Sequence, residues 1–320
     1  MYKLAVASLS LFGSLAASAG LSKASAQQAQ IGTAPAVTLP NTRVHVLHSR
    51  VNGREYLIQV ALPRSYVNAK PGDTTRYPAL YLLDGQLDFP LLYAEMQFIS
   101  LVRPTNLILV GVAAADSQFV RRNFDYTPPL TTADSAWVDS AFGGFRGPPQ
   151  GGARQFLRVL KEDVIPLIDG SYRTSGDRGI AGGSLAGLFV AYAMLEEPDL
   201  FTRYAMISPS LWYPFAARDK HLILDLEPGF AKRHPTFHKR VFISVGSEED
   251  PGMISVAHRF LWELCSSLSD GNLKGLDLAT EIVEGEGHAS VAARLHVPRT
   301  LYPADTALIK LRRAVMRECP

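Results

Sequence analysis

Short apolar runs of strand length alternate with helical patterns along most of this chain. We expect strands at 77–85, 106–114, 178–182, 203–208, 240–246 and 278–285. We expect helices at 87–102, 153–168, 185–197 and 254–268. An apolar strand that is followed by a helix and then by another apolar strand is typical of a parallel sheet with both faces covered. The pattern therefore predicts a doubly wound α/β domain.

The start of this domain and one long connection depart from the alternation. Residues 43–49 and 54–63 read as two strands joined at Asn52-Gly53, a dipeptide that favours a tight hairpin, so the domain should open antiparallel. Residues 115–152 are rich in glycine and proline and are predicted to be an irregular loop above the carboxyl ends of the strands. Because no internal repeat or linker is visible, we expect a single domain over 41–320.

The N-terminal residues have the composition of a secretory signal peptide. A lysine at position 3 precedes a short apolar run, and small-residue cleavage sites follow at 17–19 and 24–26. The run falls short of the roughly 20 residues that span a bilayer, and it has no cysteine to carry a lipid. We expect removal of 1–26, a flexible segment at 27–40 and a mature chain in the periplasm or outside the cell. An ordinary N-terminal helix is the alternative.

Charge and cysteine content narrow the possible partners. Loss of residues 1–26 removes Lys3 and Lys23 but no acid, so the net charge falls from +2 to zero. A net charge of zero does not favour nucleic acid as a binding partner, and the basic run at 231–240 is typical of a solvated loop. Cys265 and Cys319 are a candidate disulfide in an exported protein, and neither lies in a CxxC redox motif.

One serine stands where a strand is expected to turn into a helix. Ser184 follows two glycines in GGSLAG, a sequence close to the GxSxG nucleophile elbow. Small flanking residues allow a sharp turn that raises the serine oxygen, and the helix beginning at Leu185 directs its first amides toward the same point. The alternative is a glycine-rich helix start without catalytic function.

A serine nucleophile needs a base, and the base needs a carboxylate. Among the 8 histidines, His288 follows the last expected strand in GEGHAS, where glycines free the backbone. Strand 240–246 ends in three acids at the same edge of the sheet: Glu248, Glu249 and Asp250. The chain order of serine, acid and histidine is the order of α/β-hydrolases. Glu284, Glu286 and His288 could also act as metal ligands, but no second histidine accompanies them.

The second oxyanion donor should come from the loop after an earlier central strand. The segment YLLDGQ supplies it, because Gly85 permits a tight turn that points the amide of Gln86 toward the cleft. Asp84 is expected to bond within its own loop.

These motifs together resemble a known family. LPRSY, YPALYLLDGQ, RRNFDYTPP, FLRVLKEDVIPLID, GGSLAGLF, ISPSLW, VGSEE and GEGHAS occur in the order found in the esterase family of α/β-hydrolases, which includes siderophore trilactone esterases, feruloyl esterases, S-formylglutathione hydrolase and mycolyl transferases. The resemblance covers nearly all of 41–290 and is greatest for the branch with enterobactin-type esterases.

The resemblance implies an α/β-hydrolase fold with loop or cap insertions over the active site, and it implies roles for individual residues. Ser184 would be the nucleophile, His288 the base and Glu249 the acid, with Gln86 and Leu185 as oxyanion donors and no cofactor or metal. The chain departs from the branch at the elbow, where GHSLGG is usual and GGSLAG is found. Gly183 thus removes a side chain that would lie beside the site.

The sequence as a whole predicts an exported serine hydrolase that cleaves carboxylic esters through an acyl-enzyme. Arg121 and Arg122 could hold an anionic aryl ester, and Trp212 could offer a flat face to its ring. Two alternatives remain: an acyltransferase with the same triad, and a binding protein that keeps the fold without catalysis.

Overall fold

The computed structural model describes residues 36–102, 106–115, 120–130, 150–213, 222–288 and 290–303. Two units are distinguished along the chain, Met1–Pro40 and Asn41–Pro320, and every element below belongs to the second. The expected signal peptide and Cys319 lie outside the described residues, so the cleavage and disulfide predictions stay predictions.

The described residues of the second unit form one eight-stranded sheet in the order β1-β2-β4-β3-β5-β6-β7-β8. Its strands are β1 (Thr42–His48), β2 (Glu55–Ala61), β3 (Tyr77–Leu82), β4 (Ile108–Ala114), β5 (Thr174–Gly183), β6 (Arg203–Ile207), β7 (Arg240–Gly246) and β8 (Asp277–Val283). Strand β2 pairs antiparallel with β1 and β4, whereas β3 to β8 pair in parallel. The predicted hairpin start and the predicted parallel sheet are both confirmed.

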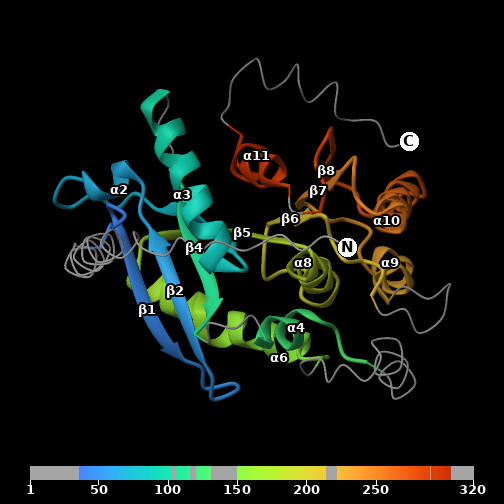
Figure 1. The fold of residues 1–320 in the computed structure, drawn as a ribbon, viewed down its shortest axis with the longest axis horizontal. Helices are drawn as coiled ribbons and strands as arrows, with labels where there is room; N and C mark the ends of the chain where they lie inside the picture. Colours follow the sequence, from blue (N-terminus) through green and yellow to red (C-terminus); the bar gives the residue numbers. More distant parts are fainter. Residues whose placement is uncertain are drawn as a thin grey trace, which may run out of the picture. The chain divides into compact units, whose positions relative to one another are not determined.

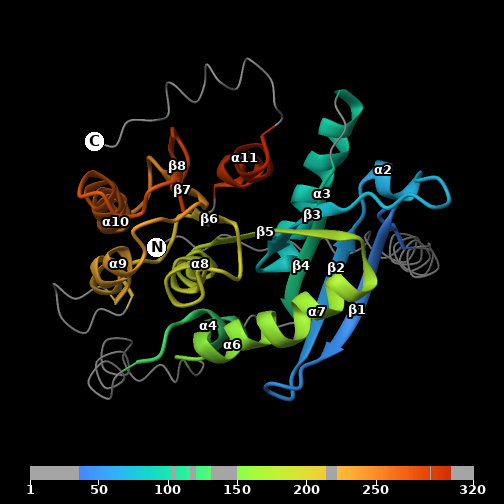
Figure 2. The same ribbon diagram turned by 180° about the vertical axis from the view of Figure 1, so that it is seen from behind.

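Helices cover both faces of this sheet (Figure 1 and Figure 2). They are α2 (Arg64–Val67), α3 (Gly85–Val102), α4 (Val120–Tyr126), α6 (Ala153–Val159), the π-helical turn η1 (Leu160–Val164), α7 (Ile165–Ser171), α8 (Leu185–Glu196), α9 (Leu222–Arg233), α10 (Pro251–Ser269) and α11 (Val291–Leu301). One face packs on α3 and α11 around Phe89, Leu92 and Val297. The other packs on α6, α8, α9 and α10 around Phe156 and Phe189.

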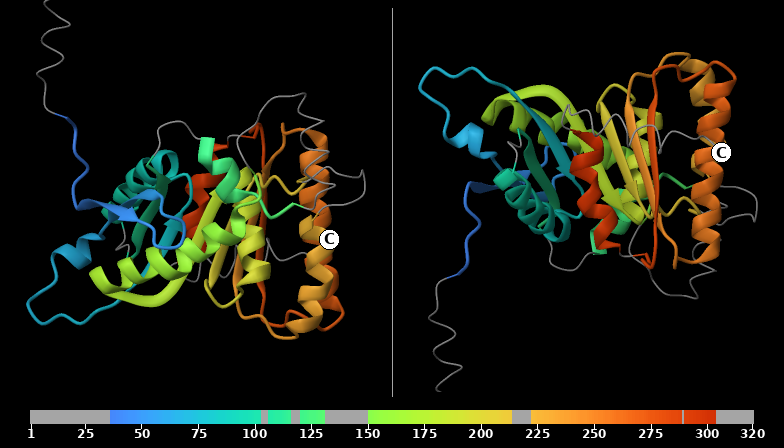
Figure 3. Two further views of the ribbon diagram at one scale, coloured as in Figure 1. Left: turned by 90° about the horizontal axis from the view of Figure 1, so that it is seen from below. Right: turned by 90° about the horizontal axis from the view of Figure 1, so that it is seen from above.

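Burial follows position in the sheet. The central strands β3 and β4 are buried on almost every residue, as expected for strands covered on both faces. Helix α8 is buried from Ala186 to Leu195, which explains why its sequence is apolar all round. Figure 3 shows α10 running alongside the last strands of the sheet.

The structure corrects four sequence predictions. The connection predicted as irregular contains α4, and residues 131–149 of it lie outside the described residues. Helices α9 and α11 are two elements that the sequence pattern does not predict. The first three residues of the basic run at 231–240, expected to lie in a loop, are the last residues of α9. Strand β8, expected to be buried, is only half-buried because it lies at one edge of the sheet. Within the described ranges, no helix combines the length and apolar character needed to cross a bilayer.

Candidate active site

The residues singled out from the sequence follow the carboxyl ends of four parallel strands. Gln86 follows β3, Ser184 follows β5, Glu249 follows β7 and His288 follows β8. Parallel strands bring these ends to one edge of the sheet, which is where ligands bind in doubly wound folds.

Ser184 lies on a strained turn between β5 and α8. Its backbone angles are φ 60° and ψ −124°, a region that costs a non-glycine residue about 1–3 kcal/mol. The surrounding backbone holds this conformation: the amide of Ser184 donates to the carbonyl of Ile207 at 2.9 Å, and its carbonyl accepts from the amides of Leu188 and Ser210. A strained serine at the start of a helix is the geometry of a nucleophile elbow.

The glycines around this serine are required by close packing. A Cβ atom on Gly182 would lie 2.7 Å from the backbone of Ala186, and one on Gly187 would lie 3.0 Å from Pro209. Helix α8 can therefore start directly against the end of β5, which leaves Ser184 half-exposed at the turn.

A chain of hydrogen-bond distances connects the serine to a carboxylate. Oγ of Ser184 lies 2.9 Å from Nε2 of His288, and Nδ1 of His288 lies 3.1 Å from Oε2 of Glu249. An ionised carboxylate only accepts hydrogen bonds, so Nδ1 carries the proton and Nε2 is left to accept from the serine. This arrangement can abstract the serine proton and stabilise the imidazolium that results.

The three acids after β7 differ sharply in environment. Glu249 has a fully buried side chain, while Glu248 and Asp250 are exposed. Burial works to raise the pKa of the Glu249 carboxyl, but hydrogen bonds from His288, Ser208 and the amide of Gly246 outweigh it and hold the pKa below its usual value. Asp250 instead caps α10 by accepting from the amide of Gly252 at 2.8 Å. Only Glu249 among these acids contacts His288.

The segment Ser208-Pro209-Ser210 after β6 contacts both ends of this series of hydrogen bonds, at Glu249 and at Ser184. The sequence motif did not indicate a function for these two serines. The hydroxyl of Ser208 donates to Oε1 of Glu249 at 2.5 Å. The hydroxyl of Ser210 lies 3.4 Å from Oγ of Ser184. Both serines are buried, so they orient neighbouring groups and do not face the solvent. The motif ISPSLW was visible in the sequence, but nothing in it says which partners its hydroxyls reach.

The two expected oxyanion donors both lie at the start of a helix. Leu185 is the first residue of α8, and Gln86 is the second residue of α3. The first amides of a helix have no partner within the helix and lie at the positive end of its dipole. Amides of this kind can stabilise an oxyanion, and the assignment of this role to Leu185 and Gln86 stays a prediction.

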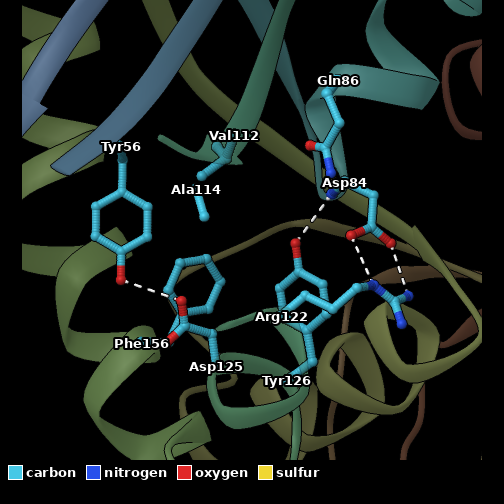
Figure 4. Close-up of a pocket in the computed structure, with 9 residues that line it drawn as sticks. All are labelled: Tyr56, Asp84, Gln86, Val112, Ala114, Arg122, Asp125, Tyr126 and Phe156. Atoms are coloured by element: carbon cyan, nitrogen blue, oxygen red, sulfur yellow. Dashed lines mark hydrogen bonds and ion pairs between the residues drawn. The ribbon is translucent and has the colours of Figure 1, made fainter. Parts of the chain in front are cut away.

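Helix α4 braces the turn that carries Gln86. The guanidinium of Arg122 donates to both oxygens of Asp84, at 2.9 and 2.8 Å, and the hydroxyl of Tyr126 accepts from the amide of Asp84 (Figure 4). The Asp84 side chain was expected to bond within its own loop, so its pairing with α4 corrects that prediction. A pocket opens beside this turn. It is lined by Tyr56, Asp84, Gln86, Val112, Ala114, Arg122, Asp125, Tyr126 and Phe156.

The remaining predicted substrate contacts lie in different settings. Arg121 is exposed at the start of α4, whereas the fork of Arg122 faces Asp84. Trp212 is half-buried, with its ring 6.3 Å from that of Tyr213. In the described part of the chain, no group of three histidine, cysteine, aspartate or glutamate side chains is placed to hold a metal ion.

Comparison with known proteins identifies the family. The family model described as "Putative esterase" matches residues 49–273, well over half of the chain. The chain belongs to this esterase family. The esterase is 29% identical over 273 residues to "Ferri-bacillibactin esterase BesA" of Bacillus subtilis (strain 168), an alignment that covers 81% of this chain and 88% of the relative.

Solved structures agree with the fold of this esterase. "Crystal structure of BES protein from Bacillus cereus" matches with a TM-score of 0.68 and 25% identity, over 84% of this chain and 96% of that one. An "IroE-like serine hydrolase" from Shewanella oneidensis matches with a TM-score of 0.66 and 24% identity, over 81% and 78% of the two chains. The predicted α/β-hydrolase fold, with its antiparallel start, is confirmed, as is the resemblance to a branch with siderophore esterases.

Proposed function

We propose that this esterase is an exported serine hydrolase that cleaves carboxylic esters through an acyl-enzyme intermediate, without a cofactor. The observation that carries the proposal is the unbroken chain from Oγ of Ser184 through His288 to the buried carboxylate of Glu249. Family membership supports ester hydrolysis as the class of activity.

The geometry accounts for the first half of the reaction. Nε2 of His288 takes the proton of Ser184 while Oγ attacks the ester carbonyl carbon, and Glu249 stabilises the positive imidazolium. The carbonyl oxygen becomes an oxyanion that accepts from the amides of Leu185 and Gln86. The intermediate then collapses: the bond to the alcohol oxygen breaks, and the alcohol leaves with the proton from His288.

The second half repeats these steps with water. His288 takes a proton from a water molecule whose oxygen attacks the acyl carbon, and the same amides hold the second oxyanion. Oγ of Ser184 leaves and regains the proton from His288, which releases the carboxylic acid. An acyltransferase would follow the same path with an alcohol in place of water, so product analysis with a competing alcohol separates the two activities.

We further propose that the substrate is a siderophore-type or other aryl ester. The relative named as a ferri-bacillibactin esterase supports this class. Exposed Arg121 could contact an anionic aryl group, and half-buried Trp212 could contact its ring. Export rests on the composition of residues 1–26.

A hydrolysis screen with a matched inactive variant tests the proposal. The mature protein and Ser184→Ala would be assayed on short-chain esters, feruloyl esters and a catecholate trilactone. We expect cleavage by the wild type and a loss of up to about a million-fold in the variant, with an unchanged thermal transition. Failure of a fluorophosphonate to label the wild type would instead support a binding protein on this fold, and retention of more than a few per cent activity by the variant would remove Ser184 from the mechanism.

A further inference from the structure

The space beside the residue that precedes the nucleophile is filled from a distant helix. A Cβ atom on Gly183 would lie 2.5 Å from Nη2 and 3.2 Å from Cζ of Arg294, a residue of α11. The next nearest atom, the carbonyl oxygen of Ile207, would be 3.6 Å away, which is an ordinary contact. A side chain at residue 183 would therefore require Arg294 to shift from this position.

Arg294 also joins the other two parts of the site. Its Nε donates to Oδ1 of Asp88 at 2.9 Å, and its Nη1 donates to the carbonyl of Ser290 at 2.8 Å. Asp88 lies two residues after Gln86 in the first turn of α3. Ser290 lies two residues after His288 and caps α11 through the amide of Ala293. The guanidinium of Arg294 thus lies against the elbow at Gly183, the loop that carries His288, and α3, the helix that carries Gln86.

The burial of these groups makes the arrangement specific. Asp88 is 6% exposed, and the side chain of Arg294 is 18% exposed, so neither charge can turn freely into solvent. Loss of one partner would leave the other charge buried without compensation. The planar guanidinium of Arg294 donates in two fixed directions, to Asp88 at the start of α3 and to Ser290 at the start of α11. It therefore also restricts the relative movement of these two helix starts.

We propose that Arg294 is a positioning residue for the proposed hydrolysis: it occupies the place of a side chain at Gly183 and holds the His288 loop against the nucleophile elbow and the start of α3. This inference rests on the proposed function for its kinetic consequences, but the position of the loop can be measured without any substrate.

A second ion pair supplies a matched control. Arg299 of α11 pairs with Glu95 of α3, so it joins the same two helices farther along both of them. If Arg294 only fastened the helices together, then Arg294→Ala and Arg299→Ala would act alike. We expect Arg294→Ala to lower kcat about ten- to hundred-fold with KM within about two-fold, as for a small misplacement of reacting groups. Arg299→Ala should stay within about two-fold of the wild type in both.

A double-mutant cycle tests the shared space. Gly183→Ala should displace Arg294 and lower kcat by a similar factor, whereas the same substitution in the Arg294→Ala background should add little, because the alanine then meets no close atom. Equal losses from Gly183→Ala in both backgrounds would overturn the proposal. If Arg294→Ala does not fold, Arg294→Lys keeps a charge for Asp88 without the planar fork, and the same fall in kcat is expected.

Hydrogen exchange separates this inference from the proposed function. Exchange of the segment 285–290 should be faster in Arg294→Ala than in the wild type and unchanged in Arg299→Ala. Absence of hydrolysis by the wild type would refute the proposed function and leave this measurement intact. Equal exchange of the segment in both variants would refute the positioning by Arg294, whatever the activity.

Discussion

The hydroxyl of Ser208 donates to Oε1 of Glu249 across 2.5 Å, while Oε2 of the same carboxylate lies 3.1 Å from Nδ1 of His288. The amide of Gly246 donates to Oε1 as well, at 2.7 Å. Two donors therefore fix one oxygen of the carboxylate, and the other oxygen is left for the imidazole. The orientation of Glu249 is set by the ends of β6 and β7 and not by the histidine alone.

The first prediction is that Ser208→Ala lowers kcat about ten-fold, because a hydrogen bond to a charged group contributes roughly 1.5–3 kcal/mol. It should also raise the pKa of Glu249 and reduce the free energy of unfolding at neutral pH. A carboxylate whose pKa is lowered by folding stabilises the folded state at pH values above the pKa that it has in the unfolded chain. This contribution disappears as the pH falls through the pKa that it has in the folded state. The stability difference between wild type and variant, from denaturant unfolding, should therefore shrink in acid.

Ser244→Ala is the control for this substitution. Ser244 is a buried serine of β7 whose hydroxyl has no hydrogen-bond partner among the described residues. Its replacement should leave kcat and the pH dependence of unfolding unchanged. Similar effects of the two substitutions would mean that Ser208 acts through packing alone.

The second prediction concerns the acid. Glu249→Gln should lower kcat on the order of ten-thousand-fold, since an amide at this position holds the imidazole in the wrong tautomer. Glu248→Gln changes an exposed side chain, and Asp250→Asn keeps a residue that caps helices well, so both should remain within about two-fold of the wild type. Steady-state kinetics on one ester ranks the three variants, and a larger loss at Glu248 or Asp250 would transfer the role to that residue.

Local patterns in the sequence were sufficient to predict most strands of the sheet and the side chains that follow their ends. Alternating apolar runs predicted β3 to β7 and their parallel pairing, because both faces of these strands are buried. The glycines around Ser184 and in the loop of His288 also indicated that these two side chains meet, since β5 and β8 run parallel and end at the same edge of the sheet.

Other features depend on contacts between distant segments and could not be predicted in this way. Helix α4 forms within a segment rich in glycine and proline, where Arg122 and Tyr126 contact Asp84 from about 40 residues away. Glu249, the buried one of three neighbouring acids, accepts a hydrogen bond from Ser208, which lies at the end of another strand. The pairing of Arg294 with Asp88 joins residues that are more than 200 positions apart. No local spacing encodes such a contact.

The third prediction separates the two arginines of α4. Arg121→Ala should raise KM for a catecholate or other anionic aryl ester about ten-fold and leave neutral short-chain esters unaffected, because Arg121 is exposed. Arg122→Ala should lower kcat for both substrate types and the free energy of unfolding by about 3 kcal/mol, because it leaves Asp84 buried without its partner.

The double variant Arg122→Ala, Asp84→Asn checks this reasoning. Removing the charge of Asp84 along with that of Arg122 should recover much of the stability lost in the single variant. Loss of binding that is selective for anionic esters in Arg122→Ala would instead show that this fork contacts the substrate directly.

The fourth prediction concerns Asp88, which faces Arg294 and lies near Asp84 and Arg122. Burial raises the pKa of its carboxyl from 3.8 to about 6, although Arg294 opposes the shift. A raised pKa means that the folded state holds a proton the unfolded state has already lost, so this contribution to stability is complete below about pH 4 and lost as pH rises through about 6. Relative to Asp88→Asn, the wild type should lose about 2 kcal/mol of unfolding free energy between pH 4 and pH 7. Denaturant unfolding of both proteins across this range measures the difference, and a gap that stays constant or widens in favour of the wild type would show that Arg294 keeps Asp88 ionised throughout.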